Sequence, residues 1–239
     1  MSDREQPRLL VAKDKNDLDR LVADTIFRKI QEAVRARNVC AIALSGGSTP
    51  VTAYTLLGSP PLGDKIPWAQ VEIYFADERA VAIDHPDSNY HLVRTTMLKN
   101  HPEAWGLMYR MPADAADPEA AADQYARRLP HPLDVLVLGM GHDGHIASLF
   151  PGSPALDERE RRVVPVTGAP KPPSCRMTIT PPVIEAARQI VMIVSGVEKA
   201  YMVSRALGGL VDPKIVPALL ARRATWIVDH AAAGAVLNP

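Results

Sequence analysis

Short apolar runs alternate with longer amphipathic stretches along most of the chain. Residues 15–37 carry apolar side chains every three or four positions, which predicts a helix with one buried face. The shorter runs, rich in branched apolar residues, predict strands. These strands are expected at residues 9–12, 39–44, 71–75, 133–138, 176–180, 190–195 and 224–228. Strands and helices therefore follow one another in a regular order.

Capping residues locate the remaining helices. Ser48 or Thr49 is expected to cap a helix that has Pro50 in its first turn, because a hydroxyl there accepts from the free N–H groups of the helix start. Ser88 is expected to cap the next helix in the same way. Further helices are predicted over residues 117–129, from residue 180 onward, over 197–207 and in the alanine-rich segment near the end.

Prolines mark two stretches that should not be regular helix. Pro217 argues against an unbroken helix over residues 213–223, because proline removes a helical hydrogen bond. Residues 165–173 are rich in proline and are too short to link two domains. We predict that they form a surface loop, which is also a candidate lid over a ligand.

The regular alternation of strands and helices predicts the fold class. Parallel strands need helical crossovers, and these cover both faces of the sheet. A chain of 239 residues is long enough for one such core and a small subdomain, and it shows no internal repeats. We therefore predict a single α/β domain over residues 1–239, with a mostly parallel, Rossmann-like sheet, helices on both faces and room for a small subdomain.

Charge and cysteine content restrict the kind of partner. Lys+Arg and Asp+Glu both number 27, so the formal net charge is zero, which argues against an extended nucleic-acid-binding face. Cys40 and Cys175 form no metal or disulfide pattern, as is typical of the reducing cytosol. No signal peptide or membrane-spanning run is evident. We predict a cytoplasmic protein, a monomer or small homo-oligomer, with no membrane or nucleic-acid partner.

Glycines interrupt the chain immediately after the apolar run at residues 133–138. Gly139 to Gly144 match the pattern G-x-G-x-x-G, which in dinucleotide-binding proteins opens a long helix and is followed by an acidic residue about 20 positions later. Here Pro151-Gly152 would end such a helix early, and the following acids lie in a charged run. The glycines are better explained as a loop beyond the strand end, where α/β sheets bind their ligands.

This loop carries His142, Asp143 and His145, which we expect at a cleft. Zinc needs three or four ligands, and the other histidines show no supporting spacing, so no metal is expected. An imidazole with an ordinary pKa near 6.5 can take a proton from water at neutral pH, and a neighbouring carboxylate can orient it. We predict His145 as the general base and Asp143 as its support. A loop histidine bonded only to the backbone remains the alternative.

The glycine-rich turn at residues 45–50 is a candidate anion site. It joins a strand to a helix start, where free N–H groups, hydroxyls and the helix dipole favour an anion. No lysine follows the glycines as in a Walker loop, and an ordinary tight turn remains the alternative. Arg79 follows another strand and offers a forked donor for an oxyanion or phosphate, and Arg176 and Lys199 could add charge. Each could equally be a surface charge.

Nucleophilic catalysis by the protein receives little support from the sequence. Cys40 lies inside a predicted strand, Cys175 has no evident partner base, and no G-x-S-x-G elbow occurs. Direct attack by water is the simpler mechanism.

Several blocks in a fixed order resemble the 6-phosphogluconolactonase family of the glucosamine-6-phosphate isomerase/lactonase superfamily. Taken together they are far more specific than any single block. They are Leu44-Ser-Gly-Gly-Ser-Thr-Pro50, Phe75-Ala-Asp-Glu-Arg79, Asp87-Ser-Asn89, the stretch from Leu138 to Gly152, Arg176-Met-Thr-Ile-Thr-Pro-Pro182 and Ser195-Gly-Val-Glu-Lys199.

The resemblance implies a reaction and a set of roles. The reaction is hydrolysis of 6-phospho-D-glucono-1,5-lactone, a small sugar-phosphate lactone, in the oxidative pentose phosphate pathway, without metal or other cofactor. His145 would activate water with support from Asp143. Arg79, positioned by Asp77, would stabilise the charge that grows on the carbonyl oxygen. The phosphate would be held by Ser45, Gly46, Gly47, Ser48, Thr49, Arg176 and Lys199.

Two other functions remain as alternatives. The related deaminases follow Asp-Gly-His with Phe-Asn-Glu-Pro, and the glutamate assists opening of the sugar ring. At the corresponding place this chain has Ser148, Leu149, Phe150 and Pro151, and phenylalanine cannot relay a proton. An amino-sugar-phosphate isomerase or deaminase is therefore disfavoured. A non-catalytic sugar-phosphate sensor could dispense with His145, which this chain retains. One departure from the lactonases is Val81-Ala82, where the family usually has Val-Pro.

Overall fold

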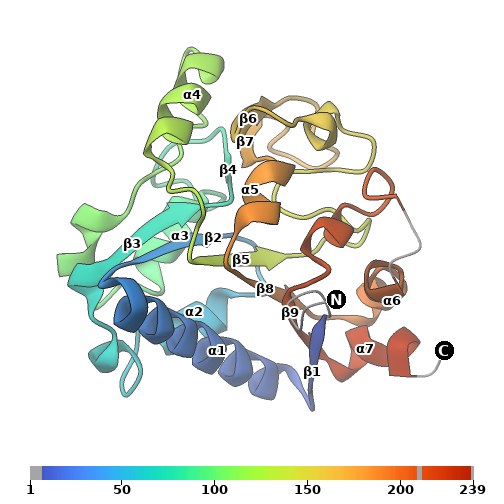
Figure 1. Ribbon diagram of the computed structural model, residues 1–239, viewed down its shortest axis with the longest axis horizontal. Helices are drawn as coiled ribbons and strands as arrows, with labels where there is room; N and C mark the ends of the chain where they lie inside the picture. The colour runs from blue at the N-terminus through green and yellow to red at the C-terminus, as the bar shows by residue number, and fades with distance from the viewer. Residues whose placement is uncertain (1–6, 209–211, 238–239) are drawn as a thin grey trace.

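A parallel sheet forms the centre of the protein in the computed structural model, which describes residues 7–208 and 212–237. Within these residues the sheet has six strands in the order β1-β9-β8-β5-β2-β3, and every neighbouring pair is parallel (Figure 1). The strands are β1 (Arg8–Ala12), β2 (Cys40–Leu44), β3 (Val71–Phe75), β5 (Val135–Gly139), β8 (Gln189–Val194) and β9 (Thr225–Asp229). The predicted parallel α/β sheet is confirmed.

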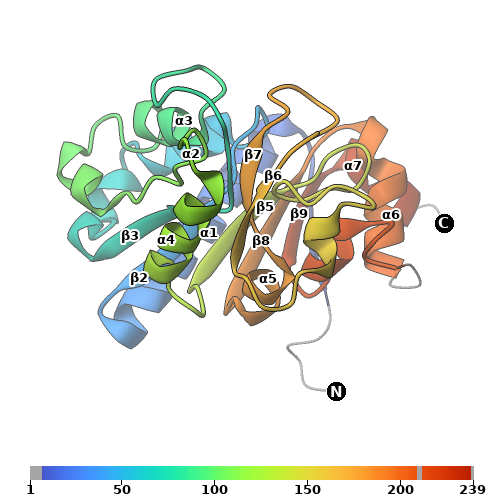
Figure 2. The ribbon, with the colours of Figure 1, turned by 90° about the horizontal axis from the view of Figure 1, so that it is seen from above.

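A second, smaller sheet covers part of one face of the large one. Its strands β4 (Asp77–Arg79), β7 (Arg176–Ile179) and β6 (Val163–Val166) are antiparallel, in the order β4-β7-β6. Figure 2 shows β6 and β7 crossing over β5 and β8. The prediction of a loop over residues 165–173 is wrong at its start, because Pro165 belongs to strand β6, where it is the partner of Met177 in β7. Proline is tolerated there since β6 is an edge strand.

Helices lie on both faces of the large sheet, as predicted. In Figure 1, α1, α2 and α7 lie below the sheet, and α4, α5 and the small sheet lie above it. The α-helices are α1 (Lys15–Arg37), α2 (Val51–Leu57), α3 (Asn89–Thr95), α4 (Pro118–Arg128), α5 (Pro181–Ala186), α6 (Ala200–Gly208) and α7 (His230–Leu237). The 3-10 helices are η1 (Gly63–Lys65), η2 (Trp68–Gln70), η3 (Pro102–Leu107), η4 (Pro154–Asp157), η5 (Val197–Lys199) and η6 (Pro217–Ala221). Among the described residues, no helix is both long and apolar enough to span a bilayer.

The predicted cap at Ser88 is confirmed, and Asp117 caps the helix that was predicted to start there. Ser88 and Asp117 each accept a hydrogen bond from a backbone N–H in the first turn of α3 and α4. The predicted cap at Ser48 or Thr49 is wrong, because Pro50 occupies the cap position of α2 and no side chain bonds to this helix start. The predicted helix over 197–207 divides into η5 and α6, and η6 begins at Pro217, where a break was expected.

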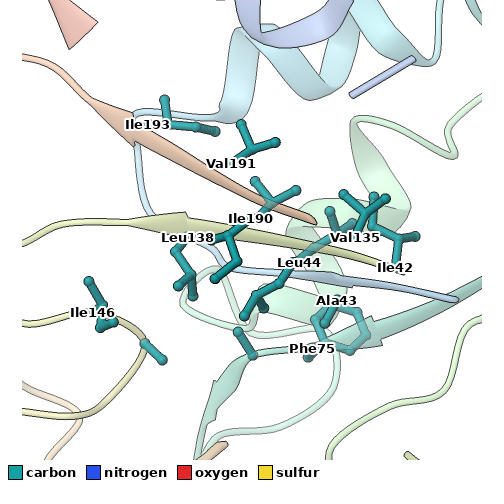
Figure 3. Packing of buried hydrophobic residues seen from close by; sticks show 14 of the residues in the cluster. Ile42, Ala43, Leu44, Phe75, Val135, Leu138, Ile146, Ile190, Val191 and Ile193 are labelled. Atoms are coloured by element: carbon teal, nitrogen blue, oxygen red, sulfur yellow. The ribbon is translucent and has the colours of Figure 1, made fainter. Parts of the chain in front are cut away.

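Burial of apolar side chains fixes the sheet and the ends of its strands. Ile42 and Leu44 of β2 pack beside Val135 and Leu138 of β5, and all four are fully buried (Figure 3). Each such side chain contributes about 1.5–3 kcal/mol on burial. One stripe of α1 packs against the same core. The residues that follow these strands are therefore held on a rigid base.

The order of the strands predicts where a ligand should bind. From β2 the chain moves to β3 on one side, and then returns to place β5, β8 and β9 on the other side. The strand order therefore reverses between β2 and β5, and their carboxyl ends leave a crevice of the kind that binds ligands in open α/β sheets. Ser45 and Gly139 stand at these two strand ends.

Candidate active site

A cavity of about 180 Å³ opens at the crevice between the ends of β2 and β5. Its wall brings together the predicted site residues from five separate parts of the chain, with the exception of Asp143. The wall consists of Ser45, Gly46, Gly47, Ser48, Thr49, Pro50, Asp77, Arg79, Gly139, Met140, Gly141, His145, Ala147, Arg176 and Lys199. Asp143 lies immediately behind it and contacts His145.

His145 is oriented by Asp143. The Nδ1 atom of His145 lies 2.5 Å from Oδ1 of Asp143, and the same oxygen accepts from the His145 backbone N–H at 3.2 Å. Burial raises the pKa of Asp143, but the hydrogen bonds and charge of His145 outweigh burial and lower that pKa to about 2. An ionised Asp143 favours a proton on Nδ1, which leaves Nε2 as the nitrogen that can accept one.

Gly141 leaves the space that the imidazole fills. A Cβ at this position would lie 2.1 Å from Nδ1 of His145 and 2.6 Å from Oδ1 of Asp143. An added Cβ would therefore force this pair of side chains to shift. A glycine is therefore required here by close approach rather than by its own backbone angles.

Replacing Gly141 with alanine should displace the His145 ring and lower kcat by about 100-fold, because a shift of about 1 Å in a reacting group costs that much. Steady-state kinetics on the phosphorylated lactone that the resemblance implies as substrate would measure the loss. Gly106→Ala is the matched control, since a Cβ at Gly106 meets no atom within 4 Å. Equal kcat values for the two variants would show that the ring position is not critical.

His142 does not reach the cavity, which corrects the expectation that it shares the cleft with His145. Its side chain is exposed, and its Nδ1 lies 3.4 Å from Nζ of Lys171. Gly144, at φ 83°, turns the backbone between the two histidines and so separates their directions. Among the described residues, no group of three or more His, Cys, Asp or Glu side chains is arranged to hold a metal ion.

Arg79 approaches the cavity from β4. Its Nη1 donates to the backbone carbonyl of Asp87 at 2.6 Å, and its buried Nε has no partner among the described residues. Asp77 forms no ion pair with Arg79 within the residues that the structure describes. Its oxygens accept instead from the hydroxyl of Ser148 at 2.8 Å and the amide of Asn89 at 3.2 Å. Asp77 therefore joins the loop that carries His145 to the start of α3.

Glu78 and Asn89 support the cavity wall from behind, and neither was predicted as a site residue from the sequence. Glu78 is fully buried and accepts from the backbone N–H groups of Arg79, Asn89 and Tyr90. Burial raises the pKa of Glu78, although these hydrogen bonds oppose the rise. Asn89 packs so closely on Gly46 that a Cβ there would lie 1.8 Å from its Oδ1. Asn89 belongs to the block Asp87-Ser-Asn89, which contributed to the family resemblance, but the sequence of this block alone does not indicate what Asn89 contacts.

The turn over residues 45–50 and two cations, Arg176 and Lys199, also line the cavity. The hydroxyl of Ser45 is buried without a partner among the described residues, and Gly47 adopts φ 99°. Burial lowers the pKa of Lys199, although nearby carboxylates oppose this. Arg176 donates from Nε to the carbonyl of Pro173 and from Nη2 to that of Lys171. These groups together suit a bound anion.

Asp229 holds the turn that carries Lys199. Its carboxylate accepts from the hydroxyl of Ser195 at 2.5 Å and from the backbone N–H of Gly196 at 3.1 Å. The carbonyl of Gly196, whose φ is 106°, then accepts from the Lys199 N–H. Hydrogen bonds to Asp229 also lower its pKa despite burial. Asp229 thus fixes the backbone turn that positions Lys199 in the cavity wall.

We expect Asp229→Ala to raise KM about tenfold for the phosphorylated lactone that the resemblance implies as substrate, a loss of about 1.4 kcal/mol of binding. We expect kcat to change less than twofold, because the predicted role of Lys199 is to hold the phosphate and not to transfer a proton. Initial-rate kinetics would separate the two parameters. Asp157→Ala removes an exposed aspartate that pairs with Lys214 and is the control. A fall in kcat at unchanged KM would be inconsistent with this role.

Fold and cavity together define an α/β enzyme in which a histidine–aspartate pair faces a glycine-rich turn and several cations. The model of one family, described as glucosamine-6-phosphate isomerases/6-phosphogluconolactonase, matches residues 13–228. The chain belongs to this family.

Curated relatives extend over most of the chain. A 6-phosphogluconolactonase of Streptomyces coelicolor is 34% identical over 95% of this chain and 94% of its own. That of Rattus norvegicus is 37% identical over 81% of this chain and 79% of its own. Some relatives, such as one from Arabidopsis thaliana, are named chloroplastic, so the family does not fix a compartment and the cytoplasmic location stays a prediction.

Solved structures give the same result. A 6-phosphogluconolactonase from Trypanosoma brucei is 27% identical and superposes with a TM-score of 0.84, covering 96% of this chain and 98% of the other. One from Shewanella baltica is 33% identical, with a TM-score of 0.81 over 94% of this chain and 97% of the other. A monomeric glucosamine-6-phosphate deaminase, at 20% identity and a TM-score of 0.81, shares the fold.

Proposed function

We propose that the chain hydrolyses 6-phospho-D-glucono-1,5-lactone to 6-phospho-D-gluconate in the oxidative pentose phosphate pathway, by attack of water that His145 activates. The observation that carries the proposal is the contact between Nδ1 of His145 and Asp143, which leaves Nε2 available beside a cationic cavity. The names of the curated relatives, which are aligned over most of the chain, support the choice of substrate.

Binding would fix the substrate by its phosphate. The turn of residues 45–50 offers backbone N–H groups and hydroxyls, and Lys199 and Arg176 add positive charge. A phosphate held there by several donors would restrict the rest of the lactone to the remaining part of the cavity, whose wall includes His145 and Arg79. Binding energy from the phosphate would thus orient the carbonyl for attack.

The chemical step would form one C–O bond, break another and pass one proton through His145 from water to the leaving oxygen. Nε2 of His145 takes a proton from water as the oxygen of that water attacks the lactone carbonyl carbon. Negative charge grows on the carbonyl oxygen, and the Arg79 guanidinium stabilises it. As the tetrahedral intermediate collapses, the ring C–O bond breaks and the imidazolium returns the proton to the leaving ring oxygen. Asp143 stabilises the imidazolium between these two events.

Phe150 favours hydrolysis over the reaction of the deaminases. Its ring lies against His145, with centroids 4.7 Å apart, at the place where the deaminases have the glutamate that assists ring opening. A phenyl ring neither donates nor accepts the proton that this step requires. The lactone needs no ring opening before attack, so the loss of that glutamate does not affect its hydrolysis.

The experiment follows the decay of freshly generated 6-phosphogluconolactone by proton release, with and without the purified protein, because this lactone also hydrolyses spontaneously. We expect decay well above the spontaneous rate, and no ammonia from glucosamine 6-phosphate. Release of ammonia would support the deaminase instead. Tight binding of the lactone without faster decay would indicate a sensor.

A further inference from the structure

The ring of Phe150 lies next to two functional side chains that come from different parts of the chain. Its centroid is 4.7 Å from that of the His145 ring, with the two rings tilted by 47°, and the Arg176 guanidinium lies over the Phe150 ring at 5.6 Å. Phe150 itself is buried, at 6% exposure. One buried side chain thus contacts both the proposed general base and a proposed phosphate ligand.

A tight turn brings Phe150 to this position. The Leu149 N–H donates to the carbonyl of Ile146, and Ala147 between them adopts φ 48°, which is unusual for a residue with a side chain. Ser148 anchors the turn, because its hydroxyl donates to Asp77 and its N–H to the hydroxyl of Thr178. The fold therefore keeps Ala147 in an unfavourable backbone conformation within the turn that places Phe150 next to the His145 ring.

The guanidinium of Arg176, which lies over the Phe150 ring, is held by two hydrogen bonds. Nε and Nη2 of Arg176 are occupied by the carbonyls of Pro173 and Lys171, at 3.1 Å and 3.0 Å. A planar guanidinium that is held along one edge and packed on one face has a single orientation left. Its Nη1 has no hydrogen-bond partner among the described residues and could donate to an anion in the cavity, whose wall includes Arg176.

We propose that Phe150 is a positioning residue, whose ring sets His145 for water activation and Arg176 for the substrate phosphate at a fixed separation. The inference rests on the proposed function and extends it to a residue that touches neither water nor substrate. An aliphatic side chain would fill the same space, but it lacks the electron-rich face that attracts a cation. Arg176 would then tilt away from the phosphate, and the His145 ring would lose one of its walls.

The test compares kcat and KM on 6-phosphogluconolactone in five proteins: wild type, Phe150→Leu, Phe150→Tyr, Arg176→Ala and the double variant Phe150→Leu/Arg176→Ala. Phe150→Leu should raise KM about fivefold through Arg176 and lower kcat about tenfold through His145. Phe150→Tyr keeps the ring and should retain most of both. In the Arg176→Ala background, Phe150→Leu should still lower kcat but should raise KM less than twofold.

The pattern across the backgrounds separates positioning from simple packing. If Phe150→Leu raises KM by the same factor with and without Arg176, or if Phe150→Tyr is as impaired as Phe150→Leu, the inference is overturned. Phe27→Leu makes the same change in a side chain packed against the core away from the cavity, and it should alter thermal stability alone. If Phe150→Leu does not fold, Phe150→Met takes its place with the same expected pattern.

This outcome is distinguishable from a failure of the proposed function. A wild-type protein that does not accelerate decay of the lactone contradicts the function itself. A wild-type protein that does so, together with a KM effect independent of Arg176, contradicts only the role of Phe150.

Discussion

Replacing His145 with alanine should lower kcat for 6-phosphogluconolactone by about 10²–10⁴-fold, the usual contribution of a positioned general base. KM should change less than threefold, because the proposed phosphate contacts are made by other residues of the cavity wall. The expected size of the effect follows from the contact with Asp143, which holds the ring with Nε2 as the acceptor. Without the imidazole, water must attack unassisted. Initial rates, corrected for spontaneous decay, measure the loss.

His142→Ala is the matched control for this variant. The two histidines lie on the same loop, but His142 is exposed and outside the cavity wall. Its removal should leave kcat within twofold of the wild type. If both alanine variants accelerate lactone decay as well as the wild type does, the assigned base is wrong.

Arg79→Ala should reduce kcat by about 100–1000-fold, as expected when one donor to a developing oxyanion is removed. The guanidinium is fixed through the Asp87 carbonyl, and its Nε has no other partner among the described residues, so it is arranged before the reaction begins. Such a donor stabilises charge in the transition state without first having to reorient. KM should rise less than kcat falls.

Two further variants are compared with Arg79→Ala: Arg79→Lys tests the shape of the donor, and Arg161→Ala is the control. Lysine keeps the charge but not the fork, and we expect it to recover only part of the rate. Arg161 is a half-exposed arginine that pairs with Glu158, and its loss should leave kcat unchanged. A rise in KM with constant kcat in Arg79→Ala would assign this arginine to ground-state binding instead.

The large sheet could be predicted from sequence because each of its strands is a local apolar run. β2 and β5 are buried along almost their whole length, and such strands are recognisable in isolation. Of the small sheet, only its central strand β7 was predicted, over residues 176–180, and its pairing with β4 and β6 could not be predicted in the same way. Asp77–Arg79 carries three charged residues, and it becomes a strand only because β7 lies beside it in the folded chain. Pairing partners distant in sequence leave no local pattern.

In the site, too, contacts between residues close in sequence could be predicted and contacts between distant residues could not. Asp143 and His145 are two residues apart, so their interaction was visible in the loop itself. Ser148 and Asp77 are 71 positions apart, and nothing in either segment indicates that they share a hydrogen bond. Asp77 was therefore expected beside Arg79, its neighbour in sequence, although the fold turns its carboxylate toward Ser148 and Asn89. The direction of a side chain in a strand depends on the surrounding fold.

A crystal structure of the protein with 6-phosphogluconate, the product, tests the central claim most directly. The proposal predicts the phosphate in the turn of residues 45–50 near Lys199, and the carboxylate within hydrogen-bond distance of both Nε2 of His145 and the Arg79 guanidinium. A product bound in the reverse direction, with its phosphate on Arg79, or one whose carboxylate lies out of reach of His145, would contradict it.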